Sequence, residues 1–142
     1  MKTEIVKLQM VRESTMEYEA RISTAEQAAE IVRKLTKNDP DEHFYVLALD
    51  TKNRINHIYE AAKGGSDSVT MNVRDLFRCA VLANASGIIV AHNHPSGDTE
   101  PSQQDVVITK RIKEACELLG FRFMDSLVVT SQSFQSITAR AF

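Results

Sequence analysis

The sequence has no long apolar run, almost no surplus of charge of one sign, and few cysteines. A membrane-spanning helix needs about 18 consecutive apolar residues, and no stretch approaches that length. Charges at Glu4, Lys7 and Arg12 interrupt the N-terminal segment, which therefore lacks the apolar core of a signal peptide. These absences predict a cytoplasmic protein without a membrane partner.

The charge balance gives no support to a polyanionic partner. Lysine and arginine number 17 against 19 aspartates and glutamates, a formal net charge of -2, so no overall positive field would attract DNA or RNA. The two cysteines, Cys79 and Cys116, are isolated and have no C-x-x-C partner. They are predicted to be buried thiols in a reducing compartment rather than a disulfide framework.

Several common catalytic signatures are also missing from the sequence. It has no H-E-x-x-H helix of a zincin, no P-C-x-x-C of a zinc deaminase, no G-x-S-x-G and no P-loop. It also has no internal repeat and no linker-like segment. The 142 residues, 43% of them hydrophobic and 25% charged, are typical of one globular domain.

Apolar periodicity and turn residues predict an alternation of helices and strands. The expected helices cover residues 24–37, 73–84 and 102–119, the expected strands cover residues 5–11, 44–49, 54–61, 87–91, 121–130 and 134–137, and a glycine-rich loop covers residues 64–67. Ser23 and Glu26 have the spacing of a capping box, and Asn72 is the expected cap of the second helix. The runs 44–49 and 87–91 are apolar throughout, which is typical of strands covered on both faces.

Polar residues directly after the apolar run 87–91 supply side chains that bind metals. His92 and His94 are separated by one residue, in a segment rich in turn formers that is expected to leave the sheet. Asp105 lies one turn into the next predicted helix, so the strand end and the helix start bring two imidazoles and a carboxylate together. Two nitrogens and one oxygen match the protein ligands of a catalytic zinc ion, whose fourth position holds water.

Each of these residues also has an ordinary structural interpretation. Ser102 and Asp105 have the spacing of an N-terminal helix cap. His92 fits a hydrogen-bonded core histidine, and His94, which precedes Pro95, fits a turn residue. The structural interpretation needs a separate reason for each position, whereas metal binding explains all of them together.

The spaced pattern H-x-H-P-S-G-x4-S-x-x-D, preceded by an acidic residue before an apolar strand, resembles the JAMM (MPN-plus) metalloprotease signature. Within that family it is most similar to the RadC-like branch. The resemblance implies an α/β protein with a single-domain JAB/MPN fold, in which a cytidine-deaminase-like mixed sheet is flanked by helices. Residues 21–142 are expected to form this domain, and residues 1–20 an N-terminal strand or extension.

The resemblance also implies a role for each site residue. Zn²⁺ would be bound by His92, His94 and Asp105. Glu42 would be the general acid/base, in keeping with the usual contribution of a carboxylate beside an activated water. Ser102 would stabilise the developing oxyanion at a helix N-terminus, where the helix dipole is also positive.

Other ionisable residues compete with these assignments. Asp41 and Glu60 are rival carboxylates to Glu42 for the proton-transfer role. His43 and His57 lack the spacing partners of a second metal site and are expected at the surface or at strand ends.

The sequence departs from the RadC-like pattern at two places. Ser126 follows Asp125 where these sequences usually have Asp-His, so any role of that histidine is missing here. The segment 72–74, Asn-Val-Arg, replaces a usual Pro-Arg pair and leaves Arg74 as the matching residue.

The expected function is a zinc-dependent hydrolase, a metallopeptidase or isopeptidase-like enzyme that cleaves an amide bond in a peptide or protein. One alternative is a non-catalytic MPN-type binding module. Another is a DNA repair or processing protein, which would need a basic groove that the composition does not indicate. The sequence specifies neither the substrate nor the oligomeric state.

Overall fold

The two runs of apolar sequence at residues 44–49 and 87–91 lie in the two central strands of a five-stranded sheet. The structure, a computed structural model, describes residues 1–18, 21–37, 39–64 and 71–141. Its elements in chain order are α1 (Ala25–Thr36), β1 (Glu42–Leu49), β2 (Ile55–Gly64), α2 (Val73–Leu82), β3 (Gly87–Asn93), α3 (Gln103–Leu119), β4 (Arg122–Val129), β5 (Phe134–Ser136) and α4 (Ile137–Ala141). Every residue of β3 is buried, as is every residue of β1 after Glu42.

The sheet is mixed, as the resemblance to the JAB/MPN fold implied. Its strand order is β2-β1-β3-β4-β5. Strand β1 is antiparallel to both β2 and β3, β4 is antiparallel to β5, and β3 is parallel to β4. A parallel pair needs a long crossover connection, and α3 supplies it between β3 and β4. This crossover carries the start of α3 past the end of β3.

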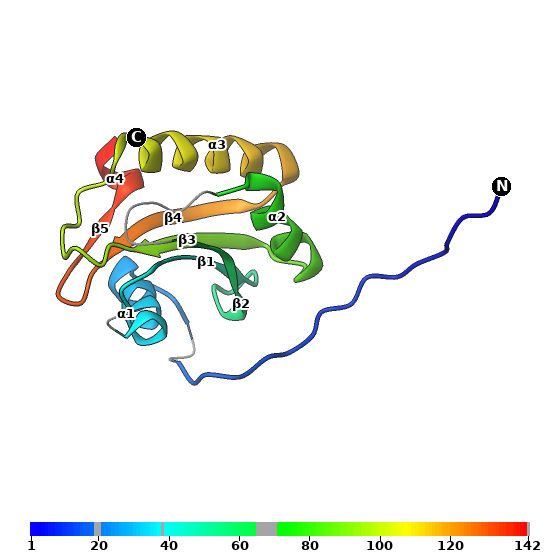
Figure 1. Ribbon diagram of the computed structural model, residues 1–142, viewed down its shortest axis with the longest axis horizontal. Helices are drawn as coiled ribbons and strands as arrows, with labels where there is room; N and C mark the ends of the chain where they lie inside the picture. The colour runs from blue at the N-terminus through cyan, green and yellow to red at the C-terminus, as the bar shows by residue number, and fades with distance from the viewer. Residues whose placement is uncertain (19–20, 38, 65–70, 142) are drawn as a thin grey trace.

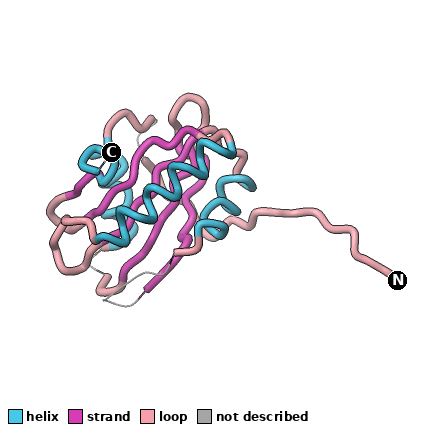
Figure 2. The backbone as a smooth tube through the Cα atoms, turned by 90° about the horizontal axis from the view of Figure 1, so that it is seen from above, coloured by secondary structure: helices cyan, strands magenta, loops and turns pink. Residues whose placement is uncertain are grey.

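Helices cover both faces of the sheet (Figure 1). Helix α1 packs on one face, against alternate residues of the strands such as Leu47, Ile89 and Leu127. Helices α2 and α3 pack on the other face, against Val46 and Val90. The view in Figure 2 shows α3 running across the strands. Because successive strand residues point to opposite faces, each central strand contributes to both cores.

Caps define the helix ends close to the predicted positions, with one shift. The capping box of α1 is formed by Thr24 and Gln27 rather than by Ser23 and Glu26, because the helix begins one residue later than the sequence pattern indicated. Asn72 caps α2 as predicted. Helix α3 ends at Gly120, whose φ of 81° lies in the left-handed region that glycine adopts without strain.

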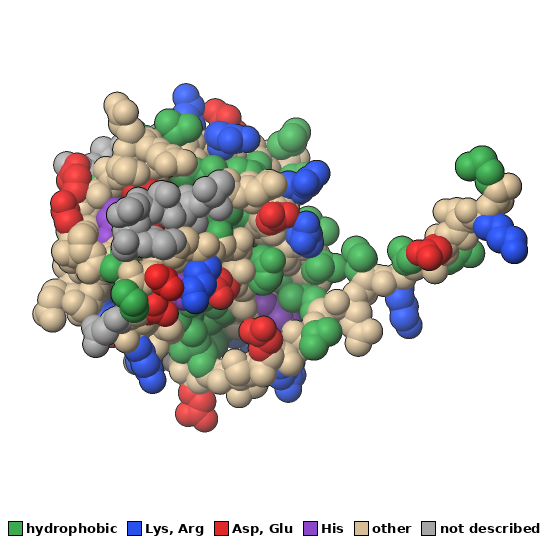
Figure 3. Space-filling model, viewed as in Figure 1, with side chains coloured by type: hydrophobic (Ala, Val, Ile, Leu, Met, Phe, Trp, Pro, Cys, Tyr) green, Lys and Arg blue, Asp and Glu red, His purple; other side chains and the backbone are tan. Residues whose placement is uncertain are grey.

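The N-terminal strand expected at residues 5–11 is wrong. The described residues 1–18 contain no helix or strand, and Ile5 and Val11 are 100% and 84% exposed. A strand needs a neighbour to pair with, and this arm projects away from the domain (Figures 1 and 3). The arm is anchored at its end, where the Tyr18 hydroxyl donates to the Ile55 carbonyl and accepts from the Ile55 N–H, at 2.9 and 2.6 Å.

Two further expectations concern the loops and the cysteines. Gly64 is the last residue of β2, and the rest of the expected loop at residues 64–67 lies outside the described residues. Cys79 and Cys116 are free and buried, as predicted, and burial raises the pKa of their thiols to about 11 and about 12. Among the described helices, none has the length and apolar character needed to cross a membrane.

Candidate metal centre

Strand β3 extends further than its apolar run indicated, and this extension positions both histidines. His92 and Asn93 belong to β3, so the expectation that the chain leaves the sheet at His92 is wrong. His92 pairs with Phe44 of β1 and with Val128 of β4. The N–H of His94 still donates to the Val129 carbonyl, at 3.0 Å. Because strand residues two apart share a face, the pleat itself directs both imidazoles to the face covered by α2 and α3.

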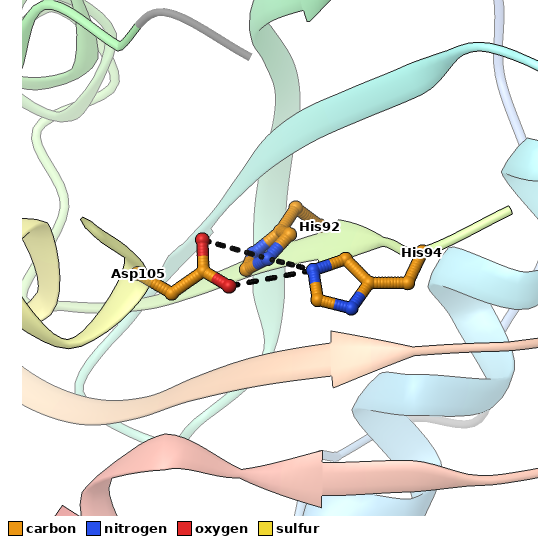
Figure 4. A group of neighbouring side chains, drawn as sticks. All are labelled: His92, His94 and Asp105. Carbon is orange, nitrogen blue, oxygen red and sulfur yellow. Dashed lines mark hydrogen bonds and ion pairs between the residues drawn. The ribbon is translucent and has the colours of Figure 1, made fainter. Parts of the chain in front are cut away.

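The three predicted metal ligands converge at this end of the sheet (Figure 4). Nε2 of His92 and Nε2 of His94 are 3.1 Å apart. The Asp105 carboxylate comes from the first turn of α3. Its Oδ1 lies 3.3 Å from Nε2 of His92, and its Oδ2 lies 3.3 Å from Nε2 of His94. One ligand atom from each residue lies within 4.8 Å of the others. Lone pairs of imidazole nitrogens and carboxylate oxygens repel one another at these distances, and a bound cation would remove that repulsion.

A different contact orients each ligand. Nδ1 of His94 donates to the Asp98 carbonyl at 2.9 Å, which leaves Nε2 as the lone-pair nitrogen of the neutral ring. The ring of His92 stacks on Phe44 at a centroid distance of 5.6 Å and an interplanar angle of 4°. Asp105 is held by the α3 capping box, in which its Oδ2 accepts from the Ser102 N–H at 2.9 Å.

The contacts between Asp105 and the two histidines change the ionisation of the site. Burial opposes ionisation of Asp105, but hydrogen bonds from His92 and His94 outweigh it and place the pKa of Asp105 far below its usual value. The hydrogen bond to Asp105 in turn raises the pKa of His94 despite burial, and the charge of Glu42 acts in the same direction. A divalent cation bound there would require neutral histidines and an ionised Asp105.

Glu42 lies on the same side of the sheet as the three ligands. It is half-buried at the first position of β1, two residues before Phe44, which pairs with His92. Residues opposite each other on antiparallel strands project to the same face, and continuing the register places Glu42 opposite His94. Its electrostatic effect on His94 agrees with that position.

The rival carboxylates are engaged elsewhere. The side chain of Asp41 lies 3.8 Å from Nζ of Lys63. Glu60 contacts Nδ1 of His43, and the His43 ring stacks on Tyr45, a core residue of the α1 side of the sheet. The structure therefore does not bring Asp41 or Glu60 into the cluster of metal ligands.

His43 lies at the start of β1, one of the two kinds of position that the sequence suggested, but it is not a surface residue. It is only 7% exposed, and its Nε2 lies 2.9 Å from Oδ2 of Asp39 while Nδ1 contacts Glu60. Burial alone would lower the pKa of His43, but the two carboxylates outweigh burial and raise it. In the pairing of β1 with β2, Glu60 lies opposite Tyr45, and its carboxylate contacts the nearby His43 ring. His57, in contrast, is exposed.

Ser102 has two interactions available at the start of α3. Its hydroxyl accepts from the Asp105 N–H at 3.0 Å as the helix cap, and an accepting hydroxyl keeps its own proton for donation. The residue is exposed beside an open depression of about 680 Å³ along the first turns of α3. Its lining residues are Pro101, Ser102, Gln103, Gln104, Val106 and Val107.

A family comparison agrees with this arrangement of strands, helices and side chains. Residues 22–142 match the sequence profile of the RadC-like JAB domain. The chain belongs to the RadC-like JAB domain family. The five-stranded mixed sheet between helices is the JAB fold that the resemblance implied.

Similar proteins from several bacteria carry the name UPF0758 protein. That of Coprothermobacter proteolyticus is 40% identical over 124 residues, which cover 84% of this chain and 52% of the relative. That of Desulforudis audaxviator is 36% identical over 121 residues, covering 85% and 53%, and that of Thermotoga maritima is 45% identical over 91 residues, covering 64% and 41%. The chain spans about half the length of the curated relatives it matches.

The departure from the RadC-like pattern at Ser126 has a structural consequence. Ser126 is buried in β4, and its hydroxyl lies 2.9 Å from that of Thr109, one turn beyond Asp105 in α3. This hydrogen bond ties α3 to the sheet next to the ligand cluster. Arg74, the residue matched to the family Pro-Arg pair, lies in the first turn of α2.

Three contacts in this RadC-like site had no recognisable signal in the sequence. They are the stacking of Phe44 on His92, the Asp98 carbonyl that accepts from His94, and the carboxamide of Asn93, which binds β1. Each depends on strand register or on loop conformation. Knowledge that β1 pairs with β3, rather than with β2 alone, would have identified Phe44 and Asn93.

Proposed function

We propose that this RadC-like JAB domain is a zinc-dependent hydrolase, of the metallopeptidase or isopeptidase type, that cleaves an amide bond in a peptide or protein. The observation that carries the proposal is the convergence of His92, His94 and Asp105 on one point, with Glu42 on the same face of the sheet. A structural histidine pair would not need a carboxylate oxygen 3.3 Å from each ring nitrogen.

The donor set fits zinc. Two imidazole nitrogens and one carboxylate oxygen are a common protein shell of catalytic zinc, and the hydrogen bond from Nδ1 of His94 to the Asp98 carbonyl is the kind of contact that orients a ligating histidine. Zinc bound there supplies a Lewis acid, which polarises an amide carbonyl and makes water acidic enough to react near neutral pH.

The other site residues handle protons and charge. In the proposal Glu42 accepts the proton of the attacking water and returns it to the leaving amine, a contribution of about 10²- to 10⁴-fold for a positioned general acid/base. The Ser102 hydroxyl donates to the oxygen that gains negative charge, next to the positive N-terminus of α3.

The test combines metal analysis with turnover. Protein purified without added metal is expected to hold about one zinc per chain, and Asp105→Asn is expected to lose it, while the control His57→Gln keeps it because His57 is exposed outside the cluster. Glu42→Gln is expected to keep zinc but to lose at least about 10²-fold in turnover of a peptide and isopeptide library. Glu60→Gln is the matched carboxylate control. Undiminished turnover by Glu42→Gln, or zinc retained by Asp105→Asn, would reject the proposal.

A further inference from the structure

The side-chain carboxamide of Asn93 bonds to the β1 backbone beyond the point where the backbone hydrogen bonds between β1 and β3 end. The last paired residues of these strands are Phe44 and His92. Beyond them, Oδ1 of Asn93 accepts from the His43 N–H at 2.6 Å, and Nδ2 of Asn93 donates to the Asp41 carbonyl at 3.0 Å. Asn93 is 5% exposed, so water competes little for these two bonds.

The two backbone groups that Asn93 binds lie immediately before and after Glu42. A second set of contacts holds the same segment, because the Asp39 carboxylate accepts from the Asp41 N–H at 2.9 Å and also binds the His43 ring. The main chain on either side of Glu42 is therefore fixed although Glu42 is the first residue of its strand. Strand ends without such contacts fray readily.

We propose that Asn93 is a positioning residue that holds Glu42 at the correct distance from the metal ligands, and this inference rests on the proposed function. Asn93 stands between His92 and His94 in the sequence, so one residue connects the ligand strand to the strand of the proton-transfer residue. It acts through the backbone and does not touch the reacting atoms. A displacement of about 1 Å at a catalytic group is enough to reduce turnover about 100-fold.

The role requires a carboxamide of this length. One short side chain must donate to a carbonyl and accept from an N–H at the same time, which asparagine does. An aspartate at this position keeps the acceptor for the His43 N–H but has no donor for the Asp41 carbonyl. An alanine loses both bonds. Asn93→Asp therefore removes one of the two hydrogen bonds, and Asn93→Ala removes both.

The experiment compares the zinc-loaded wild type with Asn93→Ala, Asn93→Asp, Glu42→Gln and the control Gln135→Ala. Gln135 also donates through its carboxamide to a backbone carbonyl, that of Ser136 at 3.2 Å, but in β5 at the edge of the sheet. Four quantities are measured for each protein: the zinc content, kcat and KM on the best substrate of the peptide and isopeptide library, and the hydrogen-exchange rate of the His43 amide.

Asn93→Ala is expected to keep zinc and KM, to lower kcat about 10- to 100-fold, and to exchange the His43 amide about tenfold faster or more. Asn93→Asp is expected to keep much of the His43 protection and to lose less in kcat. Gln135→Ala is expected to match the wild type in all four quantities. If Asn93→Ala does not fold, the reduced kcat of Asn93→Asp at full zinc content decides the question.

The outcomes separate the two proposals. If Glu42→Gln lowers kcat but both Asn93 variants stay within twofold of the wild type, the positioning role is wrong and the hydrolase proposal stands. If Glu42→Gln retains full turnover, the hydrolase proposal fails. In that case, unchanged exchange of the His43 amide in Asn93→Ala also overturns the inference that Asn93 holds the backbone beside Glu42, because the exchange rate does not depend on turnover.

Discussion

At the scale of single residues, several side chains of this domain take part in two interactions at once. Asp105 is a member of the ligand cluster and also of the α3 capping box. Asn93 binds the backbone on both sides of Glu42. His43 binds Asp39 through one ring nitrogen and Glu60 through the other. Substitution of any of these residues is therefore expected to affect more than one property.

His43 makes the stability of the domain depend on pH. Its pKa in the folded protein is raised above the ordinary value of 6.5, so the folded state binds the proton more tightly than the unfolded state. The stabilisation is fully present below about pH 6.5 and is lost as the pH rises through the folded pKa. Urea denaturation of the zinc-saturated protein is expected to show a decline in unfolding free energy between pH 6.5 and the folded pKa.

The matched comparison for this prediction is His43→Gln against His57→Gln. The first substitution is expected to flatten the decline, since glutamine does not titrate in this range. The second removes an exposed histidine from β2 and is expected to leave the decline unchanged. An equally steep decline in His43→Gln would show that other groups cause the pH dependence.

At the scale of elements, α3 links helix stability to the metal site through its first turn. Ser102 and Asp105 exchange two hydrogen bonds across the capping box, at 2.9 and 3.0 Å. The hydrogen bond between Thr109 and Ser126 fixes the next turn of the helix on β4. The position of the carboxylate relative to the histidines of β3 therefore depends on how α3 begins.

Substitutions at Ser102 separate its capping role from the proposed donation to an oxyanion. Ser102→Ala is expected to lower the unfolding free energy by about 1 kcal/mol and to reduce turnover. Ser102→Asp is expected to retain stability, because aspartate caps helices as well as serine does, while still reducing turnover, because an ionised carboxylate has no proton to donate. Chemical denaturation and library turnover measure the two effects. Wild-type turnover in Ser102→Asp would show that the serine serves only as a cap.

At the scale of the whole molecule, a residue of β1 meets residues from the end of β3 and the start of α3 at one end of the sheet. Glu42 comes from β1, His92 from β3, His94 from the position directly after β3, and the carboxylate from α3. The exposed arm is remote from the packed domain in Figure 3, where lysine, arginine, aspartate and glutamate side chains are interspersed on the visible face. The contacts of the arm with the domain begin near Met16 and Tyr18, which pack against the core on the α1 side.

Removal of residues 2–15 is expected to leave the domain intact. The deletion removes exposed side chains only, so the unfolding free energy should change by less than about 0.5 kcal/mol. Tyr18→Phe is the matched substitution at the anchor, and it is expected to cost about 1–3 kcal/mol because it leaves the Ile55 N–H and carbonyl without the Tyr18 hydroxyl. Urea denaturation compares the two. A large loss from the deletion would place the arm within the folded unit.

The sequence by itself determined the features that depend on near neighbours in the chain. Caps and apolar periodicity located α1, α2 and α3 to within a few residues, whereas α4 (Ile137–Ala141) was not predicted. Continuous apolar runs identified β1 and β3. The identity of the ligand-type residues also followed from the sequence, because His92, His94 and Asp105 lie within one strand end and the next helix start. These features are local, so their physical causes act over one or two turns of chain.

Only the tertiary structure decided what depends on strand pairing. Pairing of β1 with β3 places Glu42 opposite the ligands and Asn93 beside the backbone of His43. Pairing of β1 with β2 places Glu60 opposite Tyr45, where its carboxylate contacts the His43 ring. The same rule explains why the apolar pattern of residues 5–11 forms no strand in the described structure, since a strand is stabilised by a neighbour that its own sequence does not specify.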